Sequence, residues 1–591
     1  MTTDFEWLSG AEPGPGGEIA YVSDATGRPQ VRLLRAARHL PVDGSVRRCA
    51  WRPDGTRLLV LVDPDGGEDH RLAEIDPVTG AVEWLVAEPG VRCEVGVPYG
   101  TASAPYSPDS RLLAYASNAR DREVFDVHVR DLATGATRTV LTGDDRWLPV
   151  SFSPDATKLL VLRLHQNTEH DLVLCDLRAN TVTPLTDRTG PDKYEPIGWL
   201  PDSSGIHVCT THGRDFMGLA TLSLDGTLTW TATPPSDVEG GAVRGDLVVW
   251  GVDVGGWTRL HWTTTGSGVT HEVEGLPPGV AVHEFGYSGF VPRFTHDGRL
   301  LVQLGRPDAA TELYLADLAA GTAEKLTDFG ARLPNNLVVP REIRATSADG
   351  LRVRAHLYTP HEPNGALVVT VHGGPEYQAY PTFDPLVQEL LARGIGVLAP
   401  DIRGSSGHGL RHQRLIYGDW GGGDLDDLAA ITGALADVDW VDTTRLGVHG
   451  ASYGGFAALS CVSRLPHLWR AGVSECGSSD LVTDMLSAPP TWRKRLKAWI
   501  GDVDDPVARA ELTARGPLAN AYRVTAPVLL LHGENDTRVD PEESERMYRR
   551  LKELGKPVEL VRHPGVGHEV DRESLAATVA LIADWFTTHL G

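Results

Sequence analysis

Residues 446–456, LGVHGASYGGF, decide the fold of the C-terminal part of this 591-residue chain. An apolar run precedes the pattern Gly-x-Ser-x-Gly at 450–454, and a helix-forming stretch begins at Phe456. A strand that turns sharply into a helix through this pattern holds its serine, here Ser452, on a strained turn with the hydroxyl clear of the sheet. Side chains at 450 and 454 would collide with neighbouring backbone. Because the chain contains 64 glycines, the pentapeptide alone is weak evidence, and its surroundings must decide.

Those surroundings predict a parallel sheet covered by helices on both faces. After a predicted hairpin at 341–360, apolar runs that alternate with helical stretches occur at 367–371, 396–399, 446–448, 471–474, 528–531 and 558–561. Strands without polar alternation are typical of parallel sheets buried on both sides. A final helix is expected at 574–589. We therefore predict an α/β-hydrolase domain at 333–591.

A serine nucleophile requires a base, and the base requires an orienting carboxylate. In this fold the chain order is serine, acid, histidine, with each residue on a loop after a strand. Asp536 follows the strand at 528–531, and His568 follows the strand at 558–561. Other candidates are Asp540 or Glu534 for the acid and His563 for the base. Asp540 precedes a proline and is typical of a helix cap, whereas Glu534 and His563 lie close to strand ends.

The oxyanion of the reaction intermediate requires two backbone N–H donors. One is expected from Tyr453, the residue after the nucleophile. The other is expected from HGGP at 372–375, directly after the strand at 367–371, with the N–H of Gly374 as the main candidate. The alternative interpretation of this segment is a plain glycine-rich turn.

From residue 17 to about 328 the chain repeats one unit. An aromatic residue and Asp precede a strand, with Pro before the Asp in four of five copies and His296 in the fifth, and the aligned aspartates are Asp54, Asp109, Asp155, Asp202 and Asp297. The period is about 47 residues with four short strands per unit, which is typical of a β-propeller blade. A cryptic copy at 245–250 and a truncated opening unit bring the number of blades to seven. We predict an N-terminal segment at 1–16 and a seven-bladed propeller at 17–332, with a β-solenoid as the alternative. The repeated aspartates are expected to be structural.

Composition and charge disfavour several classes of function. The net charge is −24 and no long basic run is present, so a nucleic-acid partner is disfavoured. No basic and apolar leader begins the chain, and no run of 18 apolar residues occurs, so we expect no membrane segment. Six scattered cysteines, without metal-ligand spacing, are expected to be buried thiols in a cytoplasmic protein. We predict no metal and no cofactor. Oligomeric state stays open, with a homo-oligomer as one option.

Several motifs together resemble the prolyl oligopeptidase family of serine peptidases, in the branch of acylaminoacyl peptidases and bacterial aminopeptidases that includes puromycin-hydrolase-like enzymes. They are HGGP at 372–375, DIRGSSGHG at 401–409, GDWGGGDLDDL at 418–428, GASYGG at 450–455, HGENDTRV at 532–539 and GVGH at 565–568. The resemblance implies that Ser452, Asp536 and His568 form the catalytic triad. It also implies that Tyr453 and Gly374 form the oxyanion hole, and that 401–404 and the acidic cluster at 424–427 support the site.

The chain also departs from parts of that family. Dipeptidyl and prolyl oligopeptidases carry a tyrosine close to where this chain has His372-Gly373-Gly374, so a backbone amide must serve here. No paired-glutamate insertion is present, and Glu68 and Glu239 are only loose candidates for holding a substrate amine. Trp492 and Trp499 lie where the family builds its apolar pocket, although a core role suits them equally.

The sequence therefore predicts a serine exopeptidase or amide hydrolase that cleaves short peptides or aminoacyl amides from the N-terminal end through an acyl-enzyme, with the propeller limiting substrate size. The alternative is an acylaminoacyl peptidase. Further alternatives are a propeller-bearing binding protein whose hydrolase site has lapsed, and an esterase. The preference for a free amine is drawn from the acidic charge, which would attract a protonated terminus.

Overall fold

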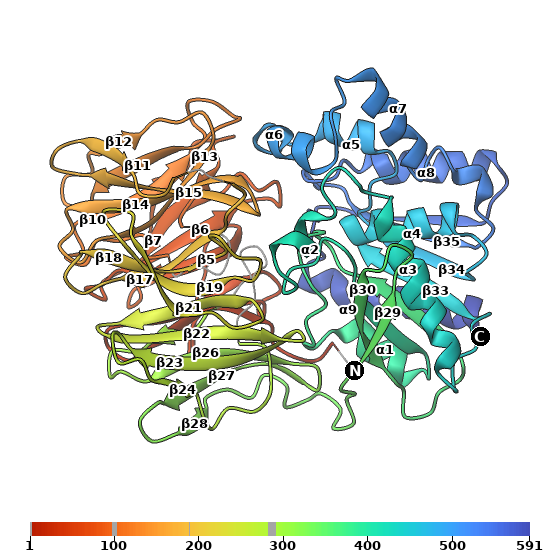
Figure 1. Ribbon diagram of the computed structural model, residues 1–591, viewed down its shortest axis with the longest axis horizontal. Coiled ribbons are helices and arrows are strands. Elements are labelled where there is room, and N and C mark those ends of the chain that lie inside the picture. The colour runs from red at the N-terminus through yellow and green to blue at the C-terminus, as the bar shows by residue number, and fades with distance from the viewer. Residues whose placement is uncertain (1–2, 97–102, 188–189, 282–290) are drawn as a thin grey trace.

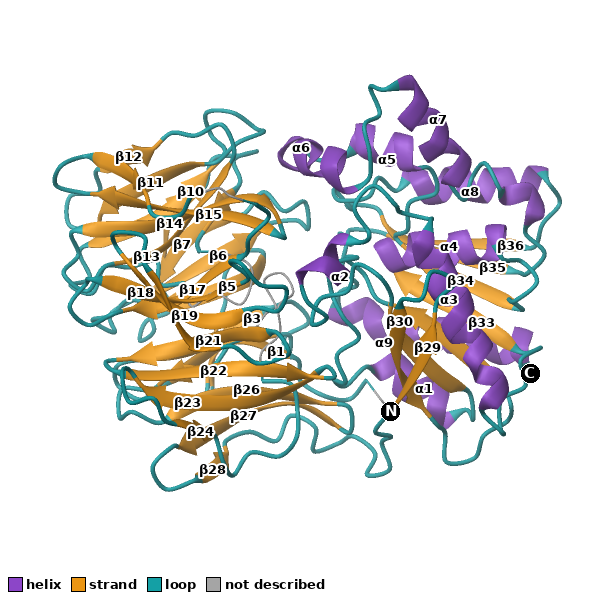
Figure 2. Cartoon of the chain, viewed as in Figure 1, coloured by secondary structure: helices purple, strands orange, loops and turns teal. Residues whose placement is uncertain are grey.

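The structure is a computed structural model that describes residues 3–96, 103–187, 190–281 and 291–591. The chain forms two domains side by side, an all-β domain from the N-terminal part and an α/β domain from the C-terminal part (Figure 1). Figure 2 shows that the helices are confined to the second domain. The architecture is a seven-bladed β-propeller joined to an α/β-hydrolase domain, as the sequence predicts.

Seven four-stranded antiparallel sheets are formed by the described residues up to Lys325, and each is built from four consecutive strands. In chain order they are β1 Leu8–Pro13, β2 Ile19–Ser23, β3 Gln30–Leu33 and β4 Arg38–Leu40; β5 Ser45–Trp51, β6 Leu58–Asp63, β7 Arg71–Ile75 and β8 Val82–Val86; β9 Cys93–Glu94, β10 Leu112–Ser117, β11 Asp126–Asp131 and β12 Thr137–Leu141; β13 Arg146–Phe152, β14 Lys158–Gln166, β15 Glu169–Asp176 and β16 Thr181–Pro184; β17 Tyr194–Trp199, β18 Gly205–Thr210, β19 Gly218–Ser223 and β20 Leu228–Ala232; β21 Val238–Arg244, β22 Leu247–Val254, β23 Trp257–Thr264 and β24 Thr270–Glu272; β25 Arg293–Phe294, β26 Leu300–Arg306, β27 Ala309–Asp317 and β28 Thr322–Lys325.

The repeated aspartates are structural, as expected. Each accepts a hydrogen bond from the backbone N–H two residues later, as Asp54 does from Thr56 at 2.9 Å and Asp155 does from Thr157 at 3.0 Å. These bonds close the turn between the first and second strands of a blade. Gly55 provides the positive φ that this turn requires. Ala156 adopts the same conformation with φ of 55°, so the turn persists in a copy without glycine.

The first sixteen residues do not form a separate segment, which corrects that expectation. Residues 8–13 are β1, which pairs with β2 in the first blade. Leu8 and Tyr21 pack with Leu301 and Leu313 of the last blade, so the ring closes by hydrophobic contact between complete blades. Before β1 the chain contacts the other domain, where Arg572 donates hydrogen bonds to the carbonyls of Thr3 and Phe5 at 2.7 and 2.5 Å.

The described residues of the second domain form an eight-stranded sheet in the order β29-β30-β32-β31-β33-β34-β35-β36. The antiparallel strands β29 and β30 stand at one edge, and β32 to β36 run parallel with β31. The bounds are β29 Arg341–Thr346, β30 Arg352–Tyr358, β31 Leu367–Val371, β32 Gly396–Asp401, β33 Leu446–Ala451, β34 Ala471–Glu475, β35 Val528–Gly533 and β36 Val558–His563.

Helices cover both faces of this sheet, and neighbouring residues of a strand serve opposite faces. Val368 packs against α1 Pro385–Ala392 and α9 Arg572–Leu590, whereas Val369 belongs to the core on the other face. Period-two alternation of this kind with both faces buried explains the continuous apolar strands. The remaining helices are α2 Leu410–Arg414, α3 Gly423–Gly433, α4 Tyr453–Arg464, α5 Leu481–Ser487, α6 Pro490–Trp499, α7 Pro506–Arg515 and α8 Glu542–Glu553.

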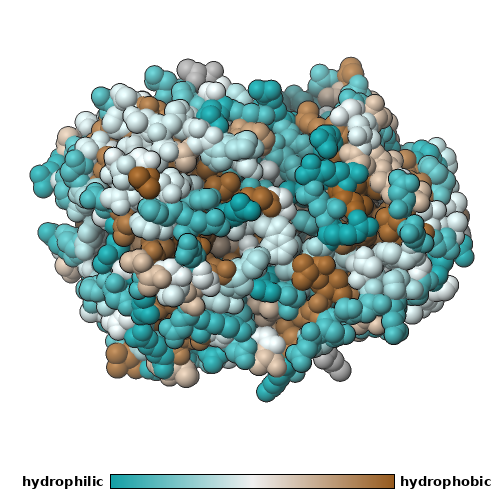
Figure 3. Space-filling view, turned by 60° about the horizontal axis from the view of Figure 1, so that its bottom comes forward, coloured by the Kyte–Doolittle hydropathy of each residue, from teal (hydrophilic) through white to brown (hydrophobic). Residues whose placement is uncertain are grey.

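Hydrophilic residues predominate on the face of the molecule in Figure 3, where hydrophobic residues gather in separate patches. Within the described part of the chain, no helix combines the length and hydropathy that crossing a bilayer requires. All six cysteines lie among the described residues, and each is buried and outside any disulfide.

Candidate active site

Ser452 stands between β33 and α4 with φ of 58° and ψ of −122°, a strained conformation for a residue with a side chain. The two glycines of the motif cannot be replaced by residues with a side chain without steric clash. A Cβ atom at Gly450 would lie 2.4 Å from the backbone carbonyl carbon of Gly454, and one at Gly454 would lie 2.1 Å from the carbonyl oxygen of Val371. The steric prediction for both glycines is therefore confirmed. The Ser452 N–H donates to the Glu475 carbonyl at 2.9 Å, which ties the turn to β34.

Asp536 and His568 are brought together from the loops after β35 and β36. His568 Nδ1 lies 2.6 Å from Asp536 Oδ2. The other carboxylate oxygen accepts from the N–H groups of Arg538 and Val539 at 2.9 and 3.1 Å. Burial alone would raise the pKa of Asp536, but His568 and the hydrogen bonds to it hold that pKa well below its usual range. The carboxylate is thus ionised and oriented to hold the imidazole.

His568 has a second neighbour that sequence reasoning missed, the thiol of Cys476 after β34. The Cys476 sulfur, an Asp536 oxygen and a His568 ring nitrogen lie within 4.8 Å of one another. Burial lowers the pKa of His568, but Cys476 and Asp536 outweigh it and raise that pKa above its usual value. No hydrogen bond joins Ser452 to His568 within the described residues. Such bonds often form only when substrate is bound.

The two predicted donor segments flank the nucleophile. The Tyr453 N–H is the first of α4, so it has no acceptor inside the helix. The Tyr453 hydroxyl donates to Asp424 of the acidic cluster at 2.7 Å, and this hydrogen bond holds the Tyr453 side chain in place. On the other side, a Cβ atom at Gly373 would lie 3.7 Å from the Ser452 Cβ. Gly374 follows with φ of 117°, which favours glycine.

The segment at 401–404 is held by buried ion pairs. Arg403 makes two hydrogen bonds to Asp427, at 2.9 and 2.8 Å. Asp401 pairs with Arg354, whose Nε lies 2.7 Å from it. Both acids are fully buried, and pairing of this kind offsets the cost of burying their charges.

Trp492 and Trp499 both lie on α6 and are half-buried against the core under that helix. Trp499 packs edge-on against Trp420, with 5.9 Å between ring centroids. Trp420 in turn packs edge-on against Tyr453 at 4.8 Å. Trp499 therefore joins an aromatic cluster beside the nucleophile, whereas the Trp492 ring contacts Arg495 at 5.5 Å. Trp420, in the motif GDWGGGDLDDL, is the aromatic residue that the sequence did not single out.

Glu68 lies on the propeller, in the loop at 64–70 between β6 and β7, and this loop packs on the loops of Asp536 and His568. Its carboxylate pairs with Arg538 at 2.5 Å and with Arg92 at 2.9 Å. Burial would raise the pKa of Glu68, but the two arginines hold it well below the usual range. Because each oxygen already faces a guanidinium, Glu68 joins the domains through an ion-pair network.

Glu239 is buried in the domain interface as well. Its carboxylate accepts hydrogen bonds from Gln378 at 3.2 Å and from the Tyr380 hydroxyl at 3.1 Å, both in the loop after β31. The loose candidates Glu68 and Glu239 therefore both contact the hydrolase domain.

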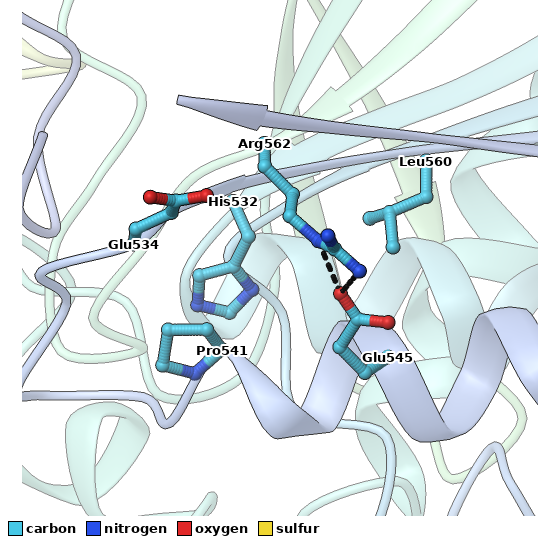
Figure 4. A pocket seen from close by; sticks show the side chains of 6 residues that line it. All are labelled: His532, Glu534, Pro541, Glu545, Leu560 and Arg562. Atoms are coloured by element: carbon cyan, nitrogen blue, oxygen red, sulfur yellow. Dashed lines mark hydrogen bonds and ion pairs between the residues drawn. The ribbon is translucent and has the colours of Figure 1, made fainter. Parts of the chain in front are cut away.

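A separate pocket lies beside His532, a neighbour of Asp536. It is lined by His532, Glu534, Pro541, Glu545, Leu560 and Arg562, and an ion pair between Glu545 of α8 and Arg562 of β36 closes one side (Figure 4). His532 Nε2 lies 3.3 Å from Asp536 Oδ2, and His532 Nδ1 lies 2.7 Å from the Ser544 hydroxyl. His532 thus contacts the same carboxylate oxygen of the acid as His568 does. The first letter of the motif HGENDTRV marks this residue in the sequence.

Asp540, the alternative candidate for the acid, caps a helix instead. It accepts from the N–H of Glu542 at 2.9 Å at the start of α8, as its position before a proline predicts.

Residues 381–591 match the model of the prolyl oligopeptidase family. The dipeptidyl aminopeptidase BIII of Pseudoxanthomonas mexicana is 26% identical, over 96% of this chain and 83% of that protein. Two other curated relatives match over less of their length, of which the chain spans 45% and 30%.

Among solved structures, a puromycin-hydrolyzing peptidase of Mycobacterium tuberculosis superposes with a TM-score of 0.84 at 21% identity, covering 100% of this chain and 95% of that one. The acylaminoacyl peptidase of Pyrococcus horikoshii gives 0.73 at 19% identity, covering 100% and 97%. At these identities the likeness concerns the fold. The match to the prolyl oligopeptidase family thus covers residues 381–591, and the relative aligned over nearly the whole chain is a dipeptidyl aminopeptidase.

Proposed function

We propose that the protein is a serine exopeptidase that removes residues from the free N-terminal end of short peptides or aminoacyl amides. The observation that carries this proposal is the 2.6 Å contact between Asp536 and His568, at the same edge of the sheet as the strained Ser452 turn. A carboxylate-bound imidazole at the same edge of the sheet as a half-buried serine is suited to nucleophilic attack on a carbonyl carbon.

In the proposed mechanism Ser452 Oγ attacks the scissile carbonyl carbon while its proton passes to His568. The carbonyl oxygen becomes an oxyanion, which the N–H groups of Tyr453 and Gly374 stabilise. The intermediate then collapses, the C–N bond breaks, and the imidazolium gives its proton to the leaving amine. Water attacks the resulting acyl-serine ester by the same route, which releases the acid and restores Ser452.

The restriction to short substrates is supported by the position of the propeller loop at 64–70. Asn535 donates to the Asp65 carbonyl at 3.1 Å. A Cβ atom at Gly567 would lie 2.6 Å from the Gly66 carbonyl oxygen, so the loop also touches the segment before His568. A chain that must pass between these loops to reach Ser452 has to be narrow.

The preference for a free amine is supported by charge. The protein carries a net charge of −24, and acidic side chains such as Asp237 and Glu239 line a cavity between the domains. A protonated amine gains from a negative potential, and the gain is larger where the surroundings are poorly screened. An acylated terminus gains nothing from it.

The test has two parts. A fluorophosphonate probe should label the native protein and not the Ser452→Ala variant; absence of labelling in the native protein would mean that the hydrolase site has lapsed. Turnover should then be compared on aminoacyl, dipeptidyl and N-acetylaminoacyl p-nitroanilides and on the matching esters. Faster cleavage of the acetylated amide identifies an acylaminoacyl peptidase, and cleavage of esters alone identifies an esterase.

All six cysteines are buried and form no disulfide, which agrees with a cytoplasmic location.

A further inference from the structure

Glu376 is a carboxylate in the domain interface to which the proposed mechanism gives no role. It lies two residues beyond Gly374 in the loop after β31, and its side chain is half-buried. A half-buried carboxylate in the domain interface can be reached by a ligand that enters between the domains.

Three uncharged side chains hold this carboxylate in place. Oε1 accepts hydrogen bonds from the Tyr417 hydroxyl at 2.9 Å and from Gln413 Nε2 at 3.2 Å. Oε2 accepts from Nδ2 of Asn167, on the propeller loop between β14 and β15, at 2.8 Å. A carboxylate offers about four lone-pair sites, so one site on Oε2 stays open.

The surroundings of Glu376 differ in this respect from those of Glu68. No ion pair to Glu376 is formed by the described residues, whereas Glu68 is paired with two arginines. Burial raises the pKa of Glu376 to about 7, although its hydrogen bonds and the nearby charge of Lys193 oppose that change. A cation placed on Oε2 would offset the cost of keeping this carboxylate ionised in a poorly solvated place.

The distance from the nucleophile suits a substrate terminus. Gly373 lies against Ser452, where its Cβ would be 3.7 Å from the serine Cβ, and Glu376 follows three residues later. Three residues span at most about 11 Å. The amine of a one- or two-residue acyl group lies within about 7 Å of the scissile carbonyl, since each extended residue adds about 3.5 Å.

The interface also has space next to this group. Gln413, which donates to Glu376, lines a cavity between the domains together with Lys193, Asp237, Glu239, Ser406 and Leu410. The cavity walls come from both domains, and a volume of about 10 Å³ leaves room for one water-sized group, such as an ammonium.

We propose that Glu376 binds the N-terminal ammonium group of the substrate and is the residue that selects free over acylated termini. This inference rests on the proposed exopeptidase function. An ammonium donates to the open site on Oε2 and neutralises the carboxylate, whereas an acetylated nitrogen carries no charge and brings a bulky carbonyl to the same place.

The decisive comparison uses Glu376→Gln, which keeps the shape of the side chain and removes its charge. The substrates are alanyl and alanyl-alanyl p-nitroanilides, whichever the native enzyme cleaves faster, and the N-acetyl counterpart of that one. We expect Glu376→Gln to lower kcat/KM for the free-amine substrate at least tenfold, mainly through KM. The acetylated substrate and the rate of fluorophosphonate labelling should change less than threefold.

A matched variant separates charge from domain contact. Asn167→Ala removes the propeller's hydrogen bond to Glu376 and keeps the carboxylate, so it should change the free and acetylated substrates by the same factor. If Glu376 only joined the domains, Glu376→Gln would also change both substrates equally, and the proposal would be wrong.

The outcomes also separate this inference from the proposed function. If the native enzyme prefers the acetylated substrate, both the free-amine specificity and the role of Glu376 are wrong. If it prefers the free amine and Glu376→Gln keeps that preference, only the role of Glu376 is wrong. Should Glu376→Gln fail to fold, Glu376→Asp retains the charge on a shorter side chain. Its preference for the free amine should then fall while labelling persists, and an unchanged preference would count against the proposal.

Discussion

Ser452 and His568 are expected to act as one unit, because the serine hydroxyl is a poor nucleophile unless the imidazole removes its proton. We predict that Ser452→Ala lowers kcat at least about 10³-fold, that His568→Ala costs a similar factor, and that the double variant loses little more. Steady-state kinetics on a small amide, with thermal unfolding as the control for folding, measure all three. Losses that multiply in the double variant would show that the two residues act independently.

The pH profile should report the surroundings of His568. Its pKa is raised by Cys476 and Asp536 against the effect of burial, and a general base must be neutral. Activity should therefore be lost as the pH falls, with the midpoint of kcat/KM above about 6.5, the usual value for histidine. Cys476→Ala removes one of the raising groups and should move this midpoint to lower pH, with a plateau within about threefold of native. Identical profiles for the two proteins would exclude this role for the thiol.

The sequence is informative about single residues only where the fold fixes their order. Ser452, Asp536 and His568 could be singled out because each follows a recognisable strand, and the structure places Asp536 against His568. Cys476 and Glu376 could not be singled out in this way. Their surroundings are formed by chain segments far apart in the sequence, such as the propeller loop that brings Asn167 to Glu376.

At the scale of elements, the turn from β33 into α4 depends on close approach of backbones. A Cβ atom at Gly454 would lie 2.1 Å from the Val371 carbonyl oxygen and 3.0 Å from that of His372, and backbone cannot move as a flexible side chain can. We predict that Gly454→Ala destabilises the protein by at least about 2 kcal/mol and abolishes fluorophosphonate labelling.

Gly433, the last residue of α3, is the matched control. A Cβ atom there meets nothing within 4 Å. Gly433→Ala should be neutral or stabilise the helix by up to about 1 kcal/mol, because alanine loses less backbone entropy on folding. Chemical denaturation of both variants provides the comparison. Equal stability of the two would mean that the turn at Gly454 tolerates a side chain.

Element prediction succeeded where a pattern repeats and failed where pairing alone defines a strand. The Pro-Asp turns identify the later blades, because each is a local signal with its own hydrogen bond. β1 carries no such signal: LSGAEP contains a glycine and a proline, and it becomes a strand by pairing with β2 and packing on the last blade. The propeller therefore begins earlier in the chain than the repeat predicts.

At the scale of the whole molecule, composition and repeat length predict two domains, and they do not predict how the domains meet. The contacts are made by loops whose residues look ordinary in sequence, such as Thr168, which bonds the Tyr417 hydroxyl at 2.9 Å. Asp145 on the propeller likewise pairs with Lys494 of α6 at 3.1 Å. Such contacts bring the propeller against both the segment at 410–417, which begins with α2, and the helix that carries Trp499.

This arrangement leads to the prediction of a length limit. The propeller loop at 64–70 contacts the loops of Asp536 and His568, so a substrate has to fit between domains that are joined by ion pairs such as Glu68–Arg538. We expect kcat/KM to fall at least about tenfold between peptides of about four and about thirty residues that share the same N-terminal sequence. The shared terminus keeps the scissile bond and the amine unchanged, so length is the only variable. Mass spectrometry of the released residues measures each rate, and a small p-nitroanilide in the same tube confirms that the enzyme stays active. Efficient digestion of a denatured protein would contradict the limit, because a chain of that length could reach Ser452 only if the domains separate readily.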